Sequence, residues 1–552
     1  MMATAIPSDA TAPRIVVLSG PVGSGKSTLG QGLAERFDLA YVRTQELMHD
    51  AAARASDPLP NERRALQDYG EKLDRDTREE WVSDGVAALV ARGEIKASLI
   101  VIDAVRTVGQ IEALRSAFPA LVTHIHVDAP REVLDARYRL RTNSGITELT
   151  SYDDVMENAT EARVSSMRED ADVAIDTNRS SVRDVLVRAA AALGLWSSRS
   201  TQLVDVFIGG QYGSEGKGNI AYHLAHEYDV LMRVGGPNAG HKVPIEPAFT
   251  HRLLPSGTLA NSNALLLIGP GATLDLAVLM GEIADCSVEA GRLIIDPQAM
   301  IIEPEDIAAE ASLTTTIAST GKGGGSAASR RIMGRSGGIT PPVRLARDVE
   351  ELSPYVGSTA EALERTFVAG KRVMLEGTQG TLLSLFHGFY PSVTSRDTTT
   401  SACLAEAGIG PHRLRRVVMV LRTYPIRVGN PSESTSGYMS QEIDWDVIAE
   451  RSGLEEATLR EVEKGSVSRS RRRVSEFDWE MLRRASELNG ATDIALTFVD
   501  YLDGDNQNAR RFDQLTKNTI HFVEEVARVA AAPVSLISTG FDNRSLIDRR
   551  EW

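Results

Sequence analysis

The stretch VFIGGQYGSEGKGNIAYHLA, Val206 to Ala225, predicts how most of the chain folds. A run of apolar residues leads into a glycine-rich turn and then into a helical pattern, an arrangement typical of phosphate binding. The glycines allow the backbone to approach an anion closely, and Lys217 would add a positive charge. Because the turn does not fit the Walker A pattern, it predicts a nucleotide site of another design. The residue in its middle is Ser214.

A Walker A loop lies nearer the N-terminus, in GPVGSGKS. It fits G-x-x-x-x-G-K-[ST], with the apolar run RIVVLSG before it and the helical pattern KSTLGQGLAERF after it. We expect Gly20, Gly23 and Gly25 to let backbone N–H groups surround the phosphates of a nucleoside triphosphate. Lys26 would reach the outer phosphates, and Ser27 would bind Mg²⁺.

Charged residues beyond this loop are further candidates. Asp103 ends the apolar run SLIVID, where it could serve Mg²⁺ or a substrate, or could simply cap a helix. The segment DARYRLR carries Arg137, Arg139 and Arg141. These three would not share one face of a helix, so some are expected to be solvated while others could clamp a transferred phosphoryl group.

Residues from about 14 to 190 resemble the adenylate-kinase-like nucleoside and nucleotide kinases. The resemblance rests on the Walker A loop and on the strands and helices expected around it. It implies ATP-dependent phosphoryl transfer, and it places Arg43, in YVRTQELM, where such kinases bind the acceptor phosphate. No motif identifies the acceptor.

The chain has 552 residues, too many for one ordinary core, so two or more domains are expected. Apolar runs alternate with helical patterns, which predicts α/β domains with parallel sheets. This pattern gives way to Gly, Ser and polar residues in AAALGLWSSRSTQ. We therefore predict a flexible tail over residues 1–13, a P-loop domain over 14–195 and a larger α/β domain over 202–552.

The net charge of −15 argues against a nucleic-acid partner, because the phosphate backbone would be repelled. No apolar run is long enough to span a bilayer, and the N-terminus lacks the pattern of a secretory signal. Two cysteines, Cys286 and Cys403, cannot form a disulfide framework, and a reducing cytoplasm is the expected location.

The segment STGKGGGSAASRR is either a linker or an anion-binding loop that orders on ligand binding.

A series of motifs follows the Val206 loop in a fixed order: RVGGPNAGHKV, HRLLPSG, IGPGATLDLAVLM, STGKGGG, VMLEGTQGTLLSLFHGFYPSVTSRDTT, GSVSRSRRRVSEFD, LTFVDYLDG and ISTGFDNR. Over residues 202–552 the chain thereby resembles the adenylosuccinate synthetase family. The resemblance implies a ligase in which an NTP, ATP or GTP, phosphorylates O6 of a 6-oxopurine nucleotide. The amino group of L-aspartate then displaces that phosphate. It also implies Mg²⁺ and a homodimer.

The resemblance assigns roles to individual residues. The catalytic residues would be Lys217, His241, Gln379 and the residue at position 214. The purine nucleotide would contact Asn238, Thr320, Gln379 and Thr394, with Arg330 or Arg331 reaching the nucleotide of the neighbouring subunit. Aspartate would be held by arginines among Arg469, Arg471, Arg472 and Arg473, of which we favour Arg471 and Arg473. The NTP base would meet Asp500, Ser538 and Gly540, and the ligase Mg²⁺ would meet Gly240.

Three positions depart from the family pattern. Ser214 replaces the Asp that removes the N1 proton of IMP and binds Mg²⁺, although an alcohol is a poor base near neutral pH. The change favours guanine, whose C2 amino group would need space and an acceptor, as in phage enzymes that act on dGMP. Ordinary IMP chemistry and a protein that binds nucleotides without turnover are the alternatives. Phe498 and Asn219 replace lysines on the NTP side, which makes ATP plausible beside GTP.

Overall fold

The computed structural model describes residues 13–95, 97–119, 122–141, 147–196, 201–464, 471–542 and 544–552. The chain divides into two compact units, Met1–Trp196 and Ser197–Trp552. The tail predicted over residues 1–13 lies outside the described residues except for its last one. No helix in the described parts of the chain combines the length and apolar character that crossing a membrane requires.

The first unit is built on a parallel sheet with the strand order β2-β3-β1-β4-β5. Its strands are β1 (Arg14–Ser19), β2 (Ala40–Arg43), β3 (Leu99–Asp103), β4 (Val122–Asp128) and β5 (Val173–Asp176). Its helices are α1 (Lys26–Phe37), α2 (Thr44–Arg54), α3 (Arg63–Thr77), α4 (Trp81–Ala91), α5 (Val108–Ala117), α6 (Arg131–Arg139), α7 (Tyr152–Met156), α8 (Ala159–Val164) and α9 (Val182–Ala192). The apolar runs RIVVLSG and SLIVID form β1 and β3, as expected for strands of a parallel sheet.

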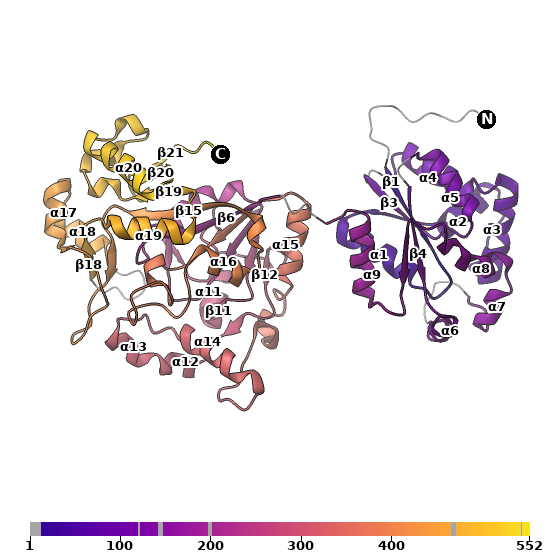
Figure 1. Ribbon diagram of the computed structural model, residues 1–552, viewed down its shortest axis with the longest axis horizontal. Coiled ribbons are helices and arrows are strands. Elements are labelled where there is room, and N and C mark those ends of the chain that lie inside the picture. The colour runs from indigo at the N-terminus through magenta and orange to yellow at the C-terminus, as the bar shows by residue number, and fades with distance from the viewer. Residues whose placement is uncertain are drawn as a thin grey trace. The chain divides into compact units, whose positions relative to one another are not determined.

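Apolar cores cover both faces of this sheet, as continuous β-branched strands require. Leu29 and Leu33 of α1 pack with Val185 of α9 on one face, while α4 and α5 cover the other through residues such as Val86 and Ile111 (Figure 1). The Walker A loop follows β1, the central strand of the sheet. Strands β3 and β2 lie on one side of β1, and β4 and β5 lie on the other. Ligands of parallel α/β sheets bind at such a point, beyond the carboxyl ends of the strands.

The second unit contains a sheet with the order β12-β10-β7-β14-β6-β15-β19-β20-β21, parallel except for β21. Its strands are β6 (Val204–Gly209), β7 (Val230–Arg233), β10 (Leu265–Ile268), β12 (Leu293–Ile295), β14 (Val373–Glu376), β15 (Leu414–Arg422), β19 (Asp493–Thr497), β20 (Val534–Ser538) and β21 (Leu546–Asp548). Smaller sheets are formed by β8 (His241–Val243) with β9 (Phe249–His251), by β11 (Thr273–Leu274) with β13 (Met300–Ile301), and by β16 (Ile426–Val428), β18 (Arg472–Ser475) and β17 (Glu442–Ile443).

The helices of this unit are α10 (Lys217–Leu224), α11 (Leu276–Asp285), α12 (Pro304–Ala309), α13 (Ala311–Thr316), α14 (Gly324–Met333), α15 (Thr359–Val368), α16 (Thr400–Ala407), α17 (Trp445–Ser452), α18 (Glu456–Val462), α19 (Trp479–Asn489) and α20 (Lys517–Ala530). Helices α15, α16, α19 and α20 pack on one face of the main sheet, and α10 and α11 pack on the other. Both predicted α/β units, each with a largely parallel sheet, are therefore confirmed.

The glycine-rich segment STGKGGGSAASRR is neither a linker nor wholly a loop, because its second half forms α14. The carboxylate of Glu310 accepts hydrogen bonds from the backbone N–H groups of Gly323 (2.8 Å), Gly325 (2.6 Å) and Ser326 (3.0 Å). These are the first N–H groups of the helix, which have no partner within it. A carboxylate supplied by the chain itself therefore fills the place where we expected an anionic ligand.

Candidate functional site

The two phosphate loops share one backbone device. In each, a glycine in the left-handed conformation, Gly25 (φ 97°) or Gly216 (φ 90°), immediately precedes the lysine that begins the next helix. Lys26 and Lys217 are both buried, with 7% and 2% of their surface exposed. Only glycine adopts this conformation without strain, and it leaves the N–H groups of the following helix turn pointing at the phosphate position.

A cavity of about 170 Å³ lies beyond the carboxyl ends of β6, β7 and β14 in the second unit. It unites residues that are up to 260 positions apart in the sequence, from Tyr212 to Arg472. The predicted residues among its lining are Ser214, Lys217, Asn238, Gly240, His241, Thr320, Gln379, Thr394 and Arg472. No carboxylate appears in this lining among the described residues, whereas Lys217, Arg427 and Arg472 contribute cationic groups. Such a cavity suits a phosphate-bearing anion.

Glu215 organises the loop around Ser214. Its Oε1 accepts hydrogen bonds from the backbone N–H groups of Gln211 (3.1 Å) and Gly213 (2.8 Å), and its Oε2 pairs with Lys217 Nζ at 2.7 Å. Ser214 between them has φ 59°, in the left-handed region. Aspartate and asparagine adopt this region more readily than serine does, so the backbone gives no reason for a serine here.

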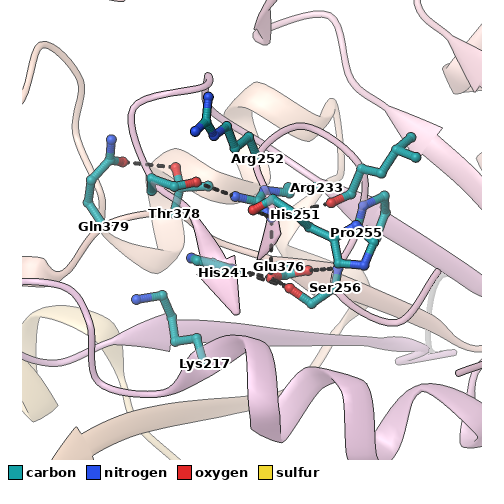
Figure 2. Close-up of polar contacts among 12 residues, drawn as sticks. Lys217, Arg233, His241, His251, Arg252, Pro255, Ser256, Glu376, Thr378 and Gln379 are labelled. Carbon is teal, nitrogen blue, oxygen red and sulfur yellow. Dashed lines mark hydrogen bonds and ion pairs between the residues drawn. The ribbon is translucent and has the colours of Figure 1, made fainter. Parts of the chain in front are cut away.

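His241 and Glu376 form a buried pair at the edge of the cavity (Figure 2). His241 Nδ1 donates to Glu376 Oε1, and the second oxygen accepts from the backbone N–H of Ser256 at 2.7 Å. Burial and the neighbouring Arg233 lower the pKa of His241 to about 4. Burial alone would raise the pKa of Glu376, but His241 and Arg233 hold it at about 2. The imidazole is thus neutral near pH 7, with its Nδ1 occupied and its Nε2 left for the cavity.

Asn238 and Gln379 complete the polar wall. Asn238 Oδ1 is buried and has no hydrogen-bond partner among the described residues. Gln379, also left-handed at φ 60°, accepts through Oε1 from the hydroxyl of Thr378 at 2.8 Å. Its amide NH₂ therefore remains a donor for a ligand. A buried acceptor without a partner is costly unless a ligand satisfies it, so Asn238 marks a position for a donor group.

A second cavity, of about 260 Å³, contains the residues predicted to meet the NTP base. Asp500, Ser538 and Gly540 all line it, together with Phe498 and Asn219. Asp500 Oδ1 is buried without a partner among the described residues, and burial raises the pKa of this carboxyl to about 7. Arg422 stacks on the ring of Phe498 at 4.0 Å. The lining is mostly apolar, as a site for a planar base would be.

The third cavity, of about 360 Å³, lies in the first unit around the Walker A loop. Gly23, Gly25, Lys26, Ser27 and Asp103 line it, as do Arg43, Arg137 and Arg141. The alternative of Asp103 as a helix cap is wrong, because Thr107 caps α5. Arg139 pairs with Asp135 at the surface, so one of the three arginines is a solvated charge, as expected.

Comparisons with known protein families give a match for each of the two units. The adenylosuccinate synthetase family model matches residues 206–340 and 343–507. Adenylosuccinate synthetase of Methanocaldococcus jannaschii is 37% identical over 356 residues, which cover 62% of this chain and 96% of that protein. That of Thermococcus onnurineus is 38% identical over 355 residues, 63% and 98% of the two chains. The chain belongs to the adenylosuccinate synthetase family. The N-terminal unit matches an AAA domain model over residues 15–173 and is a P-loop kinase-like domain fused to this ligase.

Solved structures support the same fold for the ligase unit. Fully ligated adenylosuccinate synthetase from Plasmodium falciparum matches with a TM-score of 0.55 and 21% identity, covering 63% of this chain and all of that one. Succinoaminodeoxyadenylate synthetase of cyanophage S-2L, bound to dGMP and to dATP as an energy donor, matches with a TM-score of 0.53 and 27% identity. The match covers 63% of this chain and 96% of the phage enzyme.

The structure corrects one arginine predicted from the family pattern and locates others among those predicted. Arg330 is buried and binds Asp306 through Nη2 (2.6 Å) and Nε (3.2 Å), so it holds α14 against α12 rather than reaching another subunit. Arg331 donates to backbone carbonyls at 2.8 and 3.0 Å and stays a prediction. Arg473 pairs with Glu442, whereas Arg472, which we did not favour, lines the cavity. Arg471 is exposed and does not appear in that lining, and Arg469 lies outside the described residues.

Several residues that line or support this cavity were missed from the sequence. Glu215 and Glu376 lie inside motifs that we quoted, yet each motif gives several polar residues and no spacing shows which one binds a distant partner. Arg427 lines the cavity and stacks on Tyr212 at 4.8 Å, while burial lowers its pKa to about 10. The segment around it, YPIRVGN, carries no recognisable signature.

Proposed function

We propose that the ligase unit joins L-aspartate to C6 of a guanine nucleotide, GMP or dGMP, and that the kinase-like unit transfers a phosphoryl group from ATP. The observation that carries the first part is Ser214 in a cavity whose described lining contains no carboxylate. If the enzyme used IMP and its catalytic carboxylate came from another position in the chain, an Asp or Glu would be expected in this lining, near the purine ring. The phage enzyme bound to dGMP supports the same choice.

The reaction needs two steps. Oxygen O6 attacks the γ-phosphorus of the NTP, the bond from that phosphorus to the bridging oxygen breaks, and N1 loses its proton. The amino group of aspartate then attacks C6, the phosphate leaves, and the amine loses one proton. Lys217 balances charge on the transferring phosphoryl group, and His241 Nε2 meets O6 or the phosphoryl oxygen. Ser214 Oγ accepts from the C2 amino group of guanine, and the N1 proton is lost to solvent.

The ligands of Mg²⁺ in this unit would be few. The described residues contain no group of three or more His, Cys, Asp or Glu side chains placed to hold a metal ion. Ser214 and Gly240 line the cavity, and their hydroxyl and carbonyl oxygens are neutral ligands for a metal ion. They fit Mg²⁺ only together with phosphates of the bound nucleotides, which is the usual mode for this ion. The ion would supply charge neutralisation at those phosphates.

Product analysis tests the ligase proposal directly. The full chain is incubated with aspartate, ATP or GTP, and IMP, GMP or dGMP, and products are separated by HPLC. We expect a succinylated guanine nucleotide as the main product, with kcat/KM for GMP or dGMP at least about tenfold above that for IMP. A preference for IMP, or the absence of any succinylated product, would contradict the proposal.

Asp500 predicts how the choice of NTP depends on pH. Adenine needs a donor at N1 and an acceptor at its amino group, which a protonated carboxyl provides. Guanine offers two donors, which an ionised carboxyl accepts. Because burial raises the pKa of Asp500 to about 7, the protonated form dominates below pH 7 and the ionised form above it. We expect the KM ratio of GTP to ATP to fall as pH rises from 6 to 8, by up to about tenfold per unit.

Two variants sharpen this prediction. Asp500→Asn keeps an acceptor and a donor in fixed positions, so ATP use should persist without the pH dependence, while GTP use falls by about 30-fold. Glu455→Gln is the matched control, because Glu455 lines the same cavity but is exposed at its rim. This control should keep the pH dependence of the wild type. If the ratio of the KM for GTP to the KM for ATP did not change between pH 6 and 8 in the wild type, Asp500 would not be the group that selects the NTP.

A further inference from the structure

One wall of the cavity in the kinase-like unit is a single face of α3. Arg63, Gln67, Gly70, Glu71 and Asp74 recur at three- and four-residue spacing, and all five line the cavity. Residues at this spacing lie on one side of a helix. The wall therefore begins with a guanidinium, passes an amide and a glycine, and ends with two carboxylates. At 1.5 Å per residue it extends over about 16 Å, which suits an elongated ligand with different ends.

The basic end of this wall lies beside the phosphate loop. Burial and then the charge of Arg106 lower the pKa of Lys26 to about 7, Asp103 and Glu161 act against them, and Arg63 adds to the lowering. Lys26, Arg63 and Arg106 all line the same cavity. Lys26 is the residue expected at the outermost phosphates of the bound NTP. Arg63 and Arg106 thus border the point from which a phosphoryl group would leave.

The arginines at this end differ in how they are paired. Arg63 forms two hydrogen bonds with Glu148, at 2.7 and 2.9 Å, and Arg106 pairs with Glu161 at 2.6 Å. Arg43 donates to the neutral amide of Gln45 at 3.1 Å. Among the described residues it has no carboxylate partner. A half-buried guanidinium without a counter-ion favours an anionic ligand, and its planar fork matches a phosphate.

The other end of the wall offers acceptors and an open amide. Both polar atoms of the Gln67 side chain are buried and have no partner among the described residues. Among the described residues, the hydrogen bonds to Asp74 come from two neutral donors, Trp81 Nε1 and Gln110 Nε2, both at 2.7 Å. Glu71 accepts from Asn158 at 2.8 Å through Oε1, and its Oε2 lies 3.8 Å from the exposed guanidinium of Arg75. These carboxylates can accept further hydrogen bonds, and Gln67 needs a partner that presents a donor beside an acceptor.

We propose that this cavity binds the phosphoryl acceptor, and that the acceptor is a purine nucleoside 5′-monophosphate whose base carries an amino group. Arg43, Arg63 and Arg106 hold its phosphate, Gln67 pairs with adjacent donor and acceptor atoms of the base edge, and Glu71 and Asp74 accept from amino or hydroxyl groups. The choice of purine over cytosine rests on the proposed function, in which the same chain handles purine nucleotides. Hypoxanthine, uracil and thymine lack the amino group.

The step balances without a general base. An anionic oxygen of the acceptor phosphate attacks the γ-phosphorus of ATP, forming a new P–O bond. The bond from that phosphorus to the β,γ-bridging oxygen breaks, and ADP leaves with the electron pair. The products are ADP and the diphosphate of the acceptor nucleoside. Because the attacking phosphate is already ionised near pH 7, no hydroxyl proton has to be removed.

Phosphoryl transfer by the full chain tests the inference. Without aspartate, γ-labelled ATP is offered with AMP, dAMP, GMP, dGMP, IMP, UMP, dTMP and the parent nucleosides, and labelled diphosphates are separated. We expect labelled diphosphates from the amino-purine monophosphates, with kcat/KM at least tenfold above that for IMP, UMP or dTMP. Lys26→Ala should abolish the label. Since this readout needs no succinylated product, failure of the ligase proposal and failure of this one are distinguishable.

Variants of the wall locate the acceptor. Arg43→Gln should lower kcat/KM for the monophosphate by about 30-fold and leave the KM for ATP unchanged. Gln67→Leu should lower kcat/KM for amino purines and for IMP alike by at least about tenfold, because adenine, guanine and hypoxanthine all present a donor beside an acceptor at N1 and C6. Arg139→Ala, exposed on α6, is the control and should stay within twofold of the wild type. Circular dichroism and the KM for ATP confirm that each variant is folded.

Four results would overturn the inference: labelled monophosphates made from the nucleosides in preference to labelled diphosphates, a preference for IMP, UMP or dTMP, no transfer by a protein that binds ATP, or an Arg43→Gln variant within twofold of the wild type.

Discussion

Glu376→Gln is expected to lower kcat of the ligase reaction by about 10²–10³-fold while the KM for the purine nucleotide changes little. Glu376 does not line the cavity; it acts through His241. In the wild type, its two oxygens accept from His241 Nδ1 on one side and from the Ser256 N–H on the other. A glutamine has one oxygen for these two donors. Either its NH₂ group faces the Ser256 N–H, or His241 must move its proton from Nδ1 to Nε2.

The second arrangement removes the function of the histidine. With the proton on Nε2 and a neutral amide behind it, the ring is held in the wrong tautomer and gains a proton less easily. When an anionic phosphoryl group arrives, the wild-type carboxylate favours protonation of the imidazole, whereas the amide does not. A comparable change in the triad of a serine protease costs about 10⁴ in kcat. Arg233, at 3.8 Å from Glu376, would also lose its counter-ion.

The measurement is steady-state kinetics of succinylated product formation, with thermal unfolding recorded in parallel. Asp205→Asn is a matched control, because Asp205 is equally buried, pairs with Arg415 and lies on β6 outside the cavity lining. It should lower stability but keep kcat within about threefold. If Glu376→Gln raised KM instead of lowering kcat, or lost no more activity than the control, Glu376 would be only a structural residue.

The local parts of both sites could be predicted because contiguous residues encode them. A strand, a glycine in the left-handed conformation and a lysine at the start of a helix follow one another in the chain, for Lys26 as for Lys217. Loops after parallel strands meet at one edge of a sheet, so motifs such as NAGH and EGTQG had to converge once the strands were recognised. His241 and Gln379 accordingly line one cavity.

Long-range pairing of buried charges could not be predicted. Glu376 and His241 are 135 positions apart, and nothing in either motif selects the other. Glu310 fixes the start of α14, so a stretch that reads as a flexible glycine loop becomes a helix. Arg330 was expected at a subunit interface but is held by Asp306. In each case the partner is a carboxylate from another segment of the chain, and the spacing of residues within a motif does not show which carboxylate that is.

Ser214→Asp is expected to reverse the substrate preference of the ligase. We expect kcat/KM for IMP to rise by about 10²-fold, because a positioned carboxylate replaces an alcohol as the base for N1. For GMP and dGMP it should fall by about tenfold, because the longer side chain takes the space of the C2 amino group. The ratio of the two substrates then changes by about 10³-fold. Kinetics with IMP, GMP and dGMP at equal ATP measure this ratio.

The backbone makes this exchange feasible. Ser214 has φ 59°, a conformation that aspartate accepts more readily than serine does, so the loop should keep its shape. The hydrogen bonds that hold the loop come from Glu215, and the Ser214 carbonyl accepts from Arg422 at 3.4 Å; neither uses the side chain at position 214. No other carboxylate in the described lining would compete with the new one. A change in specificity can therefore be attributed to the side chain itself.

Two further variants separate the roles of the hydroxyl and the carboxylate. Ser214→Asn has the size of aspartate without its basicity, so it should lose activity on GMP and dGMP without gaining activity on IMP. Ser214→Ala keeps the space but removes the acceptor, and should lower kcat/KM for GMP and dGMP by about tenfold. If Ser214→Asp kept the preference for guanine nucleotides, or if Ser214→Asn gained as much activity on IMP as Ser214→Asp, position 214 would not be the determinant of the purine base. A gain confined to the aspartate variant would show that one carboxylate, absent from this cavity, separates the two substrate classes.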